Sequence, residues 1–158
     1  MNKYMNFADE LSKQNVLTGH GGPFGAVIVK DGVVVGVGNN RVVQNNDPTA
    51  HGEMMAIRNA CQNLNTFDLS GCELYTSCYP CPMCLSAIIW SNIKTVYYGN
   101  TKEDAADIGF RDDFIYNYLD TLSKGEPNEE ILKMIQIDRD ETIKAFEEFK
   151  NKSDKTMY

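Results

Sequence analysis

Three cysteines, Cys78, Cys81 and Cys84, stand three residues apart in the stretch TSCYPCPMC at residues 76–84. Prolines on both sides of Cys81 are typical of the boundary and first turn of a helix. Cys81 and Cys84 are then about one helical turn apart, so both sulfur atoms can reach one zinc ion. The unpaired N–H groups of a helix start also favour the thiolate, which is the form that binds metal.

A third ligand is available upstream at His51, also at an expected helix start and two residues before Glu53. Because side chains two apart on an ideal helix point about 200° apart, these two residues divide into one ligand and one proton carrier. One imidazole and two thiolates leave one tetrahedral position open, as in catalytic zinc sites. We therefore expect one zinc ion per chain, held by His51, Cys81 and Cys84, with Glu53 as the catalytic proton acceptor.

A structural zinc site is the alternative interpretation of the same residues. If Cys78 were a fourth ligand, no position would remain for water, and the chain would be a non-catalytic, zinc-stabilised binding domain. Cys78, however, ends a strand-like segment outside the helix start that favours thiolates. We expect it to be a packed side chain, as are Cys61 and Cys72.

The segments that must position these residues alternate between strand-like and helix-like patterns. Two β-branched runs joined by Asp31 and Gly32 predict a hairpin over residues 26–38. Thr49 is expected to cap the helix that carries Glu53. The alternation predicts an α/β domain over residues 1–158, with helices covering a mixed sheet. Helices are expected at 3–16, 49–64, 82–90, 103–110 and 139–152, strands at 72–78 and 93–99, and either a strand or a helix start at 131–137.

Composition narrows the class of protein. The 158 residues are 42% hydrophobic and 23% charged, a balance typical of a single globular domain. The N-terminal residues lack the apolar run of a secretion signal, and no stretch approaches the roughly 18 apolar residues of a membrane span. The net charge of −7 disfavours nucleic acid as a partner. These features predict a cytoplasmic protein that acts on a small molecule, with no membrane partner.

The order H-x-E and then P-C-x-x-C is the signature of zinc-dependent nucleobase deaminases. It is present here as HGE at 51–53 and PCPMC at 80–84. Together with GGPFGAVIVKDG (21–32), GNN (38–40), NNDPTAHGE (45–53), residues 109–116 and a C-terminal tyrosine, it resembles the bacterial guanine deaminases of the cytidine deaminase superfamily. The resemblance implies a three-layer α-β-α fold with a central mixed five-stranded sheet. It also implies a homodimer with a swapped C-terminal segment.

The resemblance further implies a hydrolase of purine metabolism that converts guanine to xanthine and ammonia. Asn40 would hydrogen-bond the purine, and Phe24 and Trp90 would wall its pocket, although packing in the core is an equal alternative for both rings. Asp112 and Tyr158 would approach the substrate, the tyrosine from the partner subunit. Without the resemblance, Tyr158 would be interpreted as a frayed terminus.

Three positions depart from the family pattern: Gly52 replaces an alanine, Tyr79 a glutamate and Arg111 an acid. Arg111 leaves Asp113 as an alternative to Asp112. Other members of the superfamily share the zinc motif, so deamination of guanosine, of cytosine, cytidine or deoxycytidylate, or of adenosine in tRNA stays open. The negative charge and Phe24, where the tRNA enzymes tend to have valine, count against tRNA.

Overall fold

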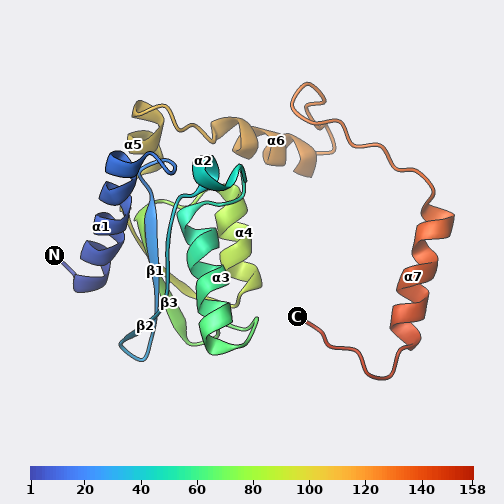
Figure 1. Ribbon diagram of the computed structural model, residues 1–158. Coiled ribbons are helices and arrows are strands. Elements are labelled where there is room, and N and C mark those ends of the chain that lie inside the picture. Colours follow the sequence, from blue (N-terminus) through green and yellow to red (C-terminus); the bar gives the residue numbers. More distant parts are fainter. The chain divides into compact units, whose positions relative to one another are not determined.

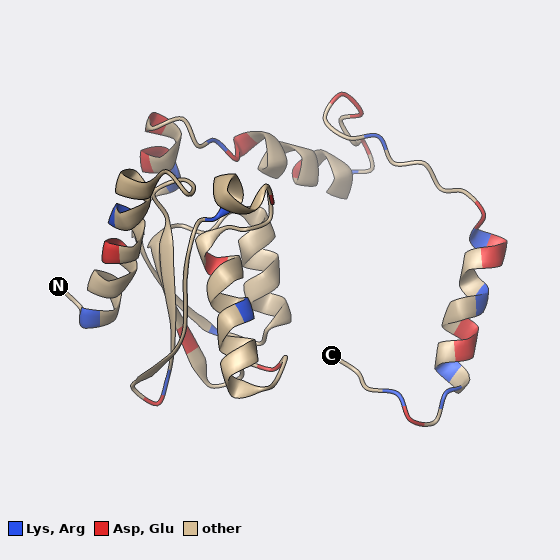
Figure 2. Cartoon of the chain, viewed as in Figure 1, with Lys and Arg blue, Asp and Glu red and all other residues tan.

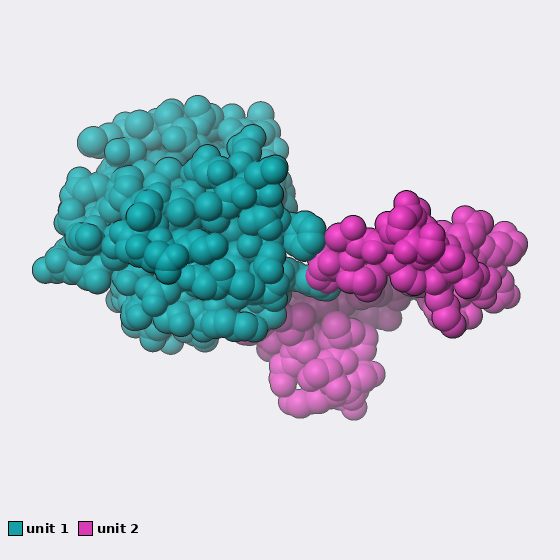
Figure 3. Space-filling view, turned by 90° about the horizontal axis from the view of Figure 1, so that it is seen from below, with its two compact units in different colours: residues 1–112 teal, residues 113–158 magenta.

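The computed structural model describes residues 1–158, which divide into two compact units. Residues 1–112 form the first and residues 113–158 the second, coloured separately in Figure 3. The first unit contains the sheet and all the predicted zinc ligands, and the second contains two helices, α6 (Asp113–Ser123) and α7 (Arg139–Asn151). The single domain expected over residues 1–158 stays a prediction.

A mixed sheet of four strands lies at the centre of the first unit (Figure 1). Its order is β2-β1-β3-β4; β1 is antiparallel to both β2 and β3, whereas β3 and β4 are parallel. The predicted hairpin is confirmed, because Asp31 and Gly32 both have positive φ, as a two-residue turn of that hand requires. The strands are β1 (Gly25–Lys30), β2 (Val33–Asn39), β3 (Cys72–Cys78) and β4 (Thr95–Asn100).

The expectation of five strands is wrong, since the sheet has four. Residues 131–137, which offered a further strand or a helix start, form neither. They have no place in the sheet's hydrogen-bond ladders, and every one of their side chains is exposed. A strand without a paired neighbour or a buried face lacks what stabilises it.

Helices cover both faces of the sheet and make three layers (Figure 1). The helix α1 (Lys3–Thr18) packs through Tyr4, Met5 and Leu11 against β1 and β3. On the other face, α3 (Gly52–Leu64) and α4 (Pro82–Trp90) bury Ala56, Ala60 and Ile88 against the sheet. Two short helices, α2 (Val42–Asn45) and α5 (Lys102–Asp107), complete the unit.

Close contact between β2 and α3 fixes where α3 begins. A Cβ atom on Gly38 would lie 2.5 Å from the carbonyl oxygen of Gly52 and 2.7 Å from the Met55 side chain. The helix therefore rests directly on the backbone of β2, and only glycine fits between them. The predicted cap at Thr49 is wrong: His51 is the N-cap residue, and the Thr49 hydroxyl instead donates to Asp47.

The second unit leaves apolar side chains uncovered. No residue of α7 is buried, and Figure 2 shows acidic and basic residues along this helix. Phe146 on α7 is 75% exposed and Ile137 before it is 72% exposed. No helix of the chain is both long enough and apolar enough to span a membrane.

Candidate active site

Two helix starts bring the three predicted zinc ligands together. His51 is the N-cap of α3, Cys81 is the N-cap of α4, and Cys84 lies in the first turn of α4 after Pro82. The His51 Nδ1 atom is 3.4 Å from the Cys81 Sγ atom and 3.7 Å from the Cys84 Sγ atom. Tetrahedral zinc, with bonds of about 2.3 Å to sulfur and about 2.0 Å to nitrogen, separates its ligand atoms by about 3.5 to 3.8 Å. The geometry therefore fits a zinc ion.

The proton balance of this group also suits a divalent cation. The pKa of Cys81 is lowered to about 4, first by the hydrogen bond from the Cys84 thiol and then by that from His51. The pKa of His51 is raised, mainly by its hydrogen bond to Cys81, and that of Cys84 is raised because its thiol donates to the Cys81 thiolate. The three side chains thus share protons around one thiolate, and a cation takes the place of those protons when it binds.

Glu53 lies in the first turn of α3 and is only 6% exposed. Its Oε2 atom lies 3.4 Å from the Cys84 Sγ atom, which places the carboxyl group at the edge of the ligand group. Its Oε1 atom lies 3.0 Å from the hydroxyl of Thr76 on β3. Burial raises the pKa of this carboxyl group. A buried carboxyl with a raised pKa beside a metal site is suited to carry protons.

Cys78 lies outside the ligand group. It ends β3, is buried, and its Sγ atom donates to the carbonyl oxygen of Thr101 at 3.5 Å. Burial raises the pKa of its thiol to about 11. A buried, neutral thiol that is bonded to a backbone carbonyl and lies outside the ligand group is a packed side chain, as the sequence indicated.

Two of the predicted substrate residues lie beside the start of α3. Asn40, which follows β2, donates its backbone N–H to the carbonyl oxygen of Phe24 at 3.0 Å. A Cβ atom on Gly52 would lie 3.2 Å from that same carbonyl oxygen. The ring of Phe24 is edge-on to Phe110, with centroids 5.0 Å apart. The chain segments that carry Asn40 and Phe24 therefore adjoin the helix that carries His51.

The other three predicted substrate residues are not gathered there. Trp90 is 68% exposed at the far end of α4, about 9 Å along the helix axis from Cys84. Asp112 is half-buried at the end of the first unit, near enough for its charge to raise the pKa of Cys78. Tyr158 is 85% exposed in the second unit. Their roles stay predictions.

The sequence analysis missed Thr76, the hydroxyl partner of Glu53. Its signal was a threonine within a strand whose inner positions are otherwise apolar. It also left open what surrounds Tyr79: the ring is edge-on to Tyr98 at 5.0 Å, and the Lys102 ammonium lies 5.1 Å from its centroid.

Comparison with known proteins gives matches to a family model, to a curated relative and to a solved structure. Residues 1–100 match the model of the family described as cytidine and deoxycytidylate deaminase zinc-binding region. Over 155 residues the chain is 45% identical to guanine deaminase of Bacillus subtilis strain 168, covering 98% of this chain and 97% of that protein. The X-ray structure of guanine deaminase from Bacillus subtilis superimposes with a TM-score of 0.91 over 100% of this chain and 99% of that one.

Other similarities cover less of the molecule. The tRNA-specific adenosine deaminase of Aquifex aeolicus strain VF5 is 49% identical over 76 residues, which are 48% of this chain and 50% of that protein. A solved structure in complex with 2,6-diaminopurine is 36% identical, with a TM-score of 0.66, and the match covers 69% of this chain and 61% of that one. Among these matches, the guanine deaminase structure covers the whole of this chain.

Proposed function

Because the chain belongs to the cytidine and deoxycytidylate deaminase family, we propose that it is a hydrolase that converts guanine to xanthine and ammonia. The observation that carries this proposal is the meeting of His51, Cys81 and Cys84 with a buried Glu53 at two helix starts. That arrangement provides three metal ligands and one proton carrier. The family and the donor set support one zinc ion per chain.

When bound, zinc would supply an activated water as the nucleophile for the ring carbon that bears the amino group. The residues of the chain supply the proton transfers. Glu53 accepts one proton from the attacking water and passes it to the ring nitrogen; it then accepts the remaining proton of the added hydroxyl group and passes it to the departing ammonia. Its burial suits this role, because a raised pKa makes the carboxylate a stronger proton acceptor and brings its pKa closer to the working pH, where a group can both accept and return a proton.

The purine would lie against Phe24 and Asn40. The Asn40 Oδ1 atom accepts from the backbone N–H of Val42 at 3.1 Å, which fixes the orientation of the carboxamide. Its N–H donors then remain for an acceptor on the base. Asp112, Trp90 and Tyr158 are proposed as further substrate contacts, as the resemblance implies, with Tyr158 reaching the site from a partner subunit.

Deamination of adenosine in tRNA is the alternative with the same chemistry. Matches to tRNA-specific adenosine deaminases cover 48% of the chain at 49% identity or 81% at 35% identity, whereas the match to guanine deaminase covers 98% at 45% identity. The net charge of −7 also disfavours a phosphate-rich substrate. Both observations favour the free purine base. A cytoplasmic location agrees with thiol ligands, which must stay reduced.

A homodimer completes the proposal. The second unit exposes a run of large apolar side chains, a pattern typical of surfaces covered by another chain. Those more than two-thirds exposed are Met134, Ile135, Ile137, Phe146, Met157 and Tyr158.

A substrate panel tests the proposed reaction. The zinc-loaded protein is incubated with guanine, guanosine, adenine, cytosine and cytidine, and ammonia release is measured. We expect release from guanine above all. Release from cytidine alone would keep the zinc chemistry and refute the purine substrate. Release from none of the five would refute the proposed function.

A further inference from the structure

One buried asparagine joins the two segments that carry the proposed purine contacts. Asn15, near the end of α1, is 2% exposed. Its Nδ2 group donates to the carbonyl oxygen of Gly22 at 2.8 Å and to that of Asn40 at 2.7 Å. Its Oδ1 atom accepts from the Nδ2 group of Asn39 at 3.0 Å. Both amide hydrogens are therefore used, one on each segment.

We propose that Asn15 is a positioning residue for the purine pocket, which sets the spacing between Phe24 and Asn40 through these two carbonyl groups. The inference rests on the proposed function, because that function gives Phe24 and Asn40 their role. Asn15 contacts neither the predicted zinc ligands nor Glu53 in any of its hydrogen bonds. Its effect should therefore fall on binding of the base and not on the chemical step.

The two segments are packed so closely that a shift in one is passed to the other. A Cβ atom on Gly21 would lie 2.6 Å from the carbonyl oxygen of Asn40 and 2.9 Å from its carbonyl carbon. Phe24 itself receives the backbone hydrogen bond of Asn40 at 3.0 Å. Because there is no free space between the two segments, the hydrogen bonds of Asn15 fix the position of one segment relative to the other.

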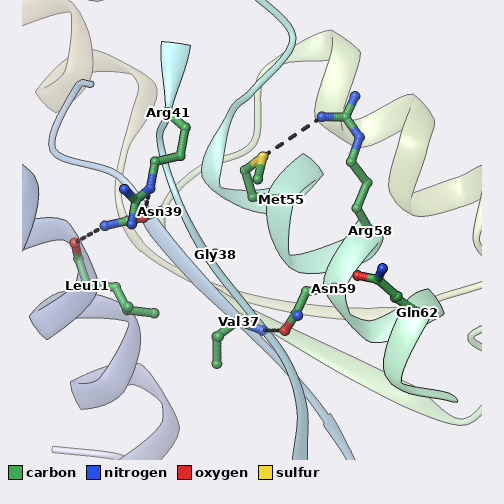
Figure 4. Close-up of a pocket in the computed structure, with 9 residues that line it drawn as sticks. All are labelled: Leu11, Val37, Gly38, Asn39, Arg41, Met55, Arg58, Asn59 and Gln62. Carbon is green, nitrogen blue, oxygen red and sulfur yellow. Dashed lines mark hydrogen bonds between the residues drawn. The ribbon is translucent and has the colours of Figure 1, made fainter. Parts of the chain in front are cut away.

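A hydrogen-bond chain leads from Asn15 to the surface. Asn39 Oδ1 accepts from Arg41 Nε at 2.8 Å, and Arg41 Nη1 lies 2.9 Å from His20 Nδ1. Because arginine only donates, the His20 nitrogen is the acceptor. Arg41 and Asn39 line a cavity of about 290 Å³ between α1, β2 and α3 (Figure 4). This series of hydrogen bonds thus has a solvent-facing end at Arg41 and a buried end at Asn15.

A purely structural role would look different. Asparagine is a poor residue inside a helix, and its side chain usually bonds to its own helix or to water. The Asn15 side chain instead forms all three of its hydrogen bonds with residues 22, 39 and 40, which lie 7 to 25 positions away in the sequence. A residue that served only the stability of the fold would not need hydrogen bonds to both segments of the pocket.

The test compares Asn15→Asp and Asn15→Ala with wild-type protein, all loaded with zinc. Aspartate keeps the acceptor for Asn39 but loses both donors, and alanine loses every bond. We expect the KM for guanine to rise about tenfold or more in each variant, since buried carbonyl groups lose their partners. The kcat should stay within about threefold, with zinc content unchanged. Two variants keep the test valid if one fails to fold.

Asn59→Ala is the matched control. Asn59 is a partly buried asparagine that accepts the backbone N–H of Val37 at 2.9 Å, but it holds neither pocket segment. It should lower the melting temperature and leave KM unchanged. An unchanged KM in both Asn15 variants, or an equal rise in Asn59→Ala, would overturn the positioning role alone. Wild-type protein that does not deaminate guanine would overturn the proposed function, and this role with it.

Discussion

The three cysteines of residues 78–84 have three different environments. Cys81 is a thiolate that accepts hydrogen bonds at a helix start, Cys84 is a buried thiol within reach of His51 and Glu53, and Cys78 donates to a carbonyl group. The spacing of the cysteines and the prolines around Cys81 were sufficient to predict this division. Thr76 differs from the apolar inner positions of its strand, but its pairing with Glu53 was not predictable, because the strand position opposite Glu53 is set only in the folded sheet.

The environments predict different effects of substitution on metal binding. Cys84→Ser should lower bound zinc from about one ion per chain to well below half, because a serine hydroxyl is a poor zinc ligand. Cys78→Ala should keep zinc and activity and lose only packing. Metal analysis after dialysis of both variants measures this. Loss of zinc from Cys78→Ala would support the four-ligand structural site.

Thr76 should influence the pH at which the enzyme works. Its hydroxyl lowers the pKa of Glu53, while burial raises it. Glu53 must be ionised to accept a proton, so activity falls as the pH drops through its pKa. Thr76→Val removes the hydroxyl, the pKa rises further, and the acid limb of the pH–rate profile should move to higher pH. Thr76→Ser keeps a hydroxyl and should keep the wild-type profile; a matching shift in both would contradict this role.

At the scale of elements, the site depends on where α3 and α4 begin. Hydrophobic pattern, prolines and the Asp31-Gly32 turn predicted these helices and the hairpin. The first residue of α3 was predicted too early in the sequence. Thr49 belongs to a turn after Asn46, where its backbone N–H donates to Asp47, and His51 is the N-cap. The helix α6 was missed, although Ile115, Tyr118 and Leu122 follow a helical spacing.

Gly38 tests the contact that positions α3. In Gly38→Ala the new Cβ atom would meet the backbone at Gly52 and Ala56, so α3 must move away from β2. Overpacking of this kind costs about 1–3 kcal/mol of stability, and the shift should also weaken zinc binding. Gly71→Ala is the control: its φ of 81° makes alanine cost about 1–2 kcal/mol, but nothing lies within 4 Å of the new atom. Equal zinc affinity in the two variants would contradict the role of this contact.

At the scale of the whole molecule, the first unit has a complete core and the second does not. In the first unit, Ala26 and Ile28 of β1 belong to one core cluster, and Val27 and Val29 belong to the other. Residues 131–137 could not be predicted in the same way. Their apolar side chains do not select between strand and helix, and within this chain they remain exposed.

Those exposed side chains predict a dimer in solution. Sedimentation analysis of the full chain should give twice the mass of 17.8 kDa. The double substitution Ile135→Asp and Ile137→Asp should shift the protein towards the monomer, because charged groups are costly in a dry interface. Val33→Asp, at a hairpin residue that is 63% exposed, should leave the mass unchanged. A wild-type monomer would contradict the homodimer.

Conversion of guanine to xanthine by wild-type protein and by Glu53→Gln, each with its zinc content measured, tests the division between metal ligands and proton carrier. Glutamine has nearly the same size as glutamate but cannot accept the proton of water. The variant should keep about one zinc ion per chain and lose activity by about 10²–10⁴-fold. Xanthine formation at the wild-type rate in zinc-loaded Glu53→Gln would contradict the role of Glu53 as the catalytic proton carrier.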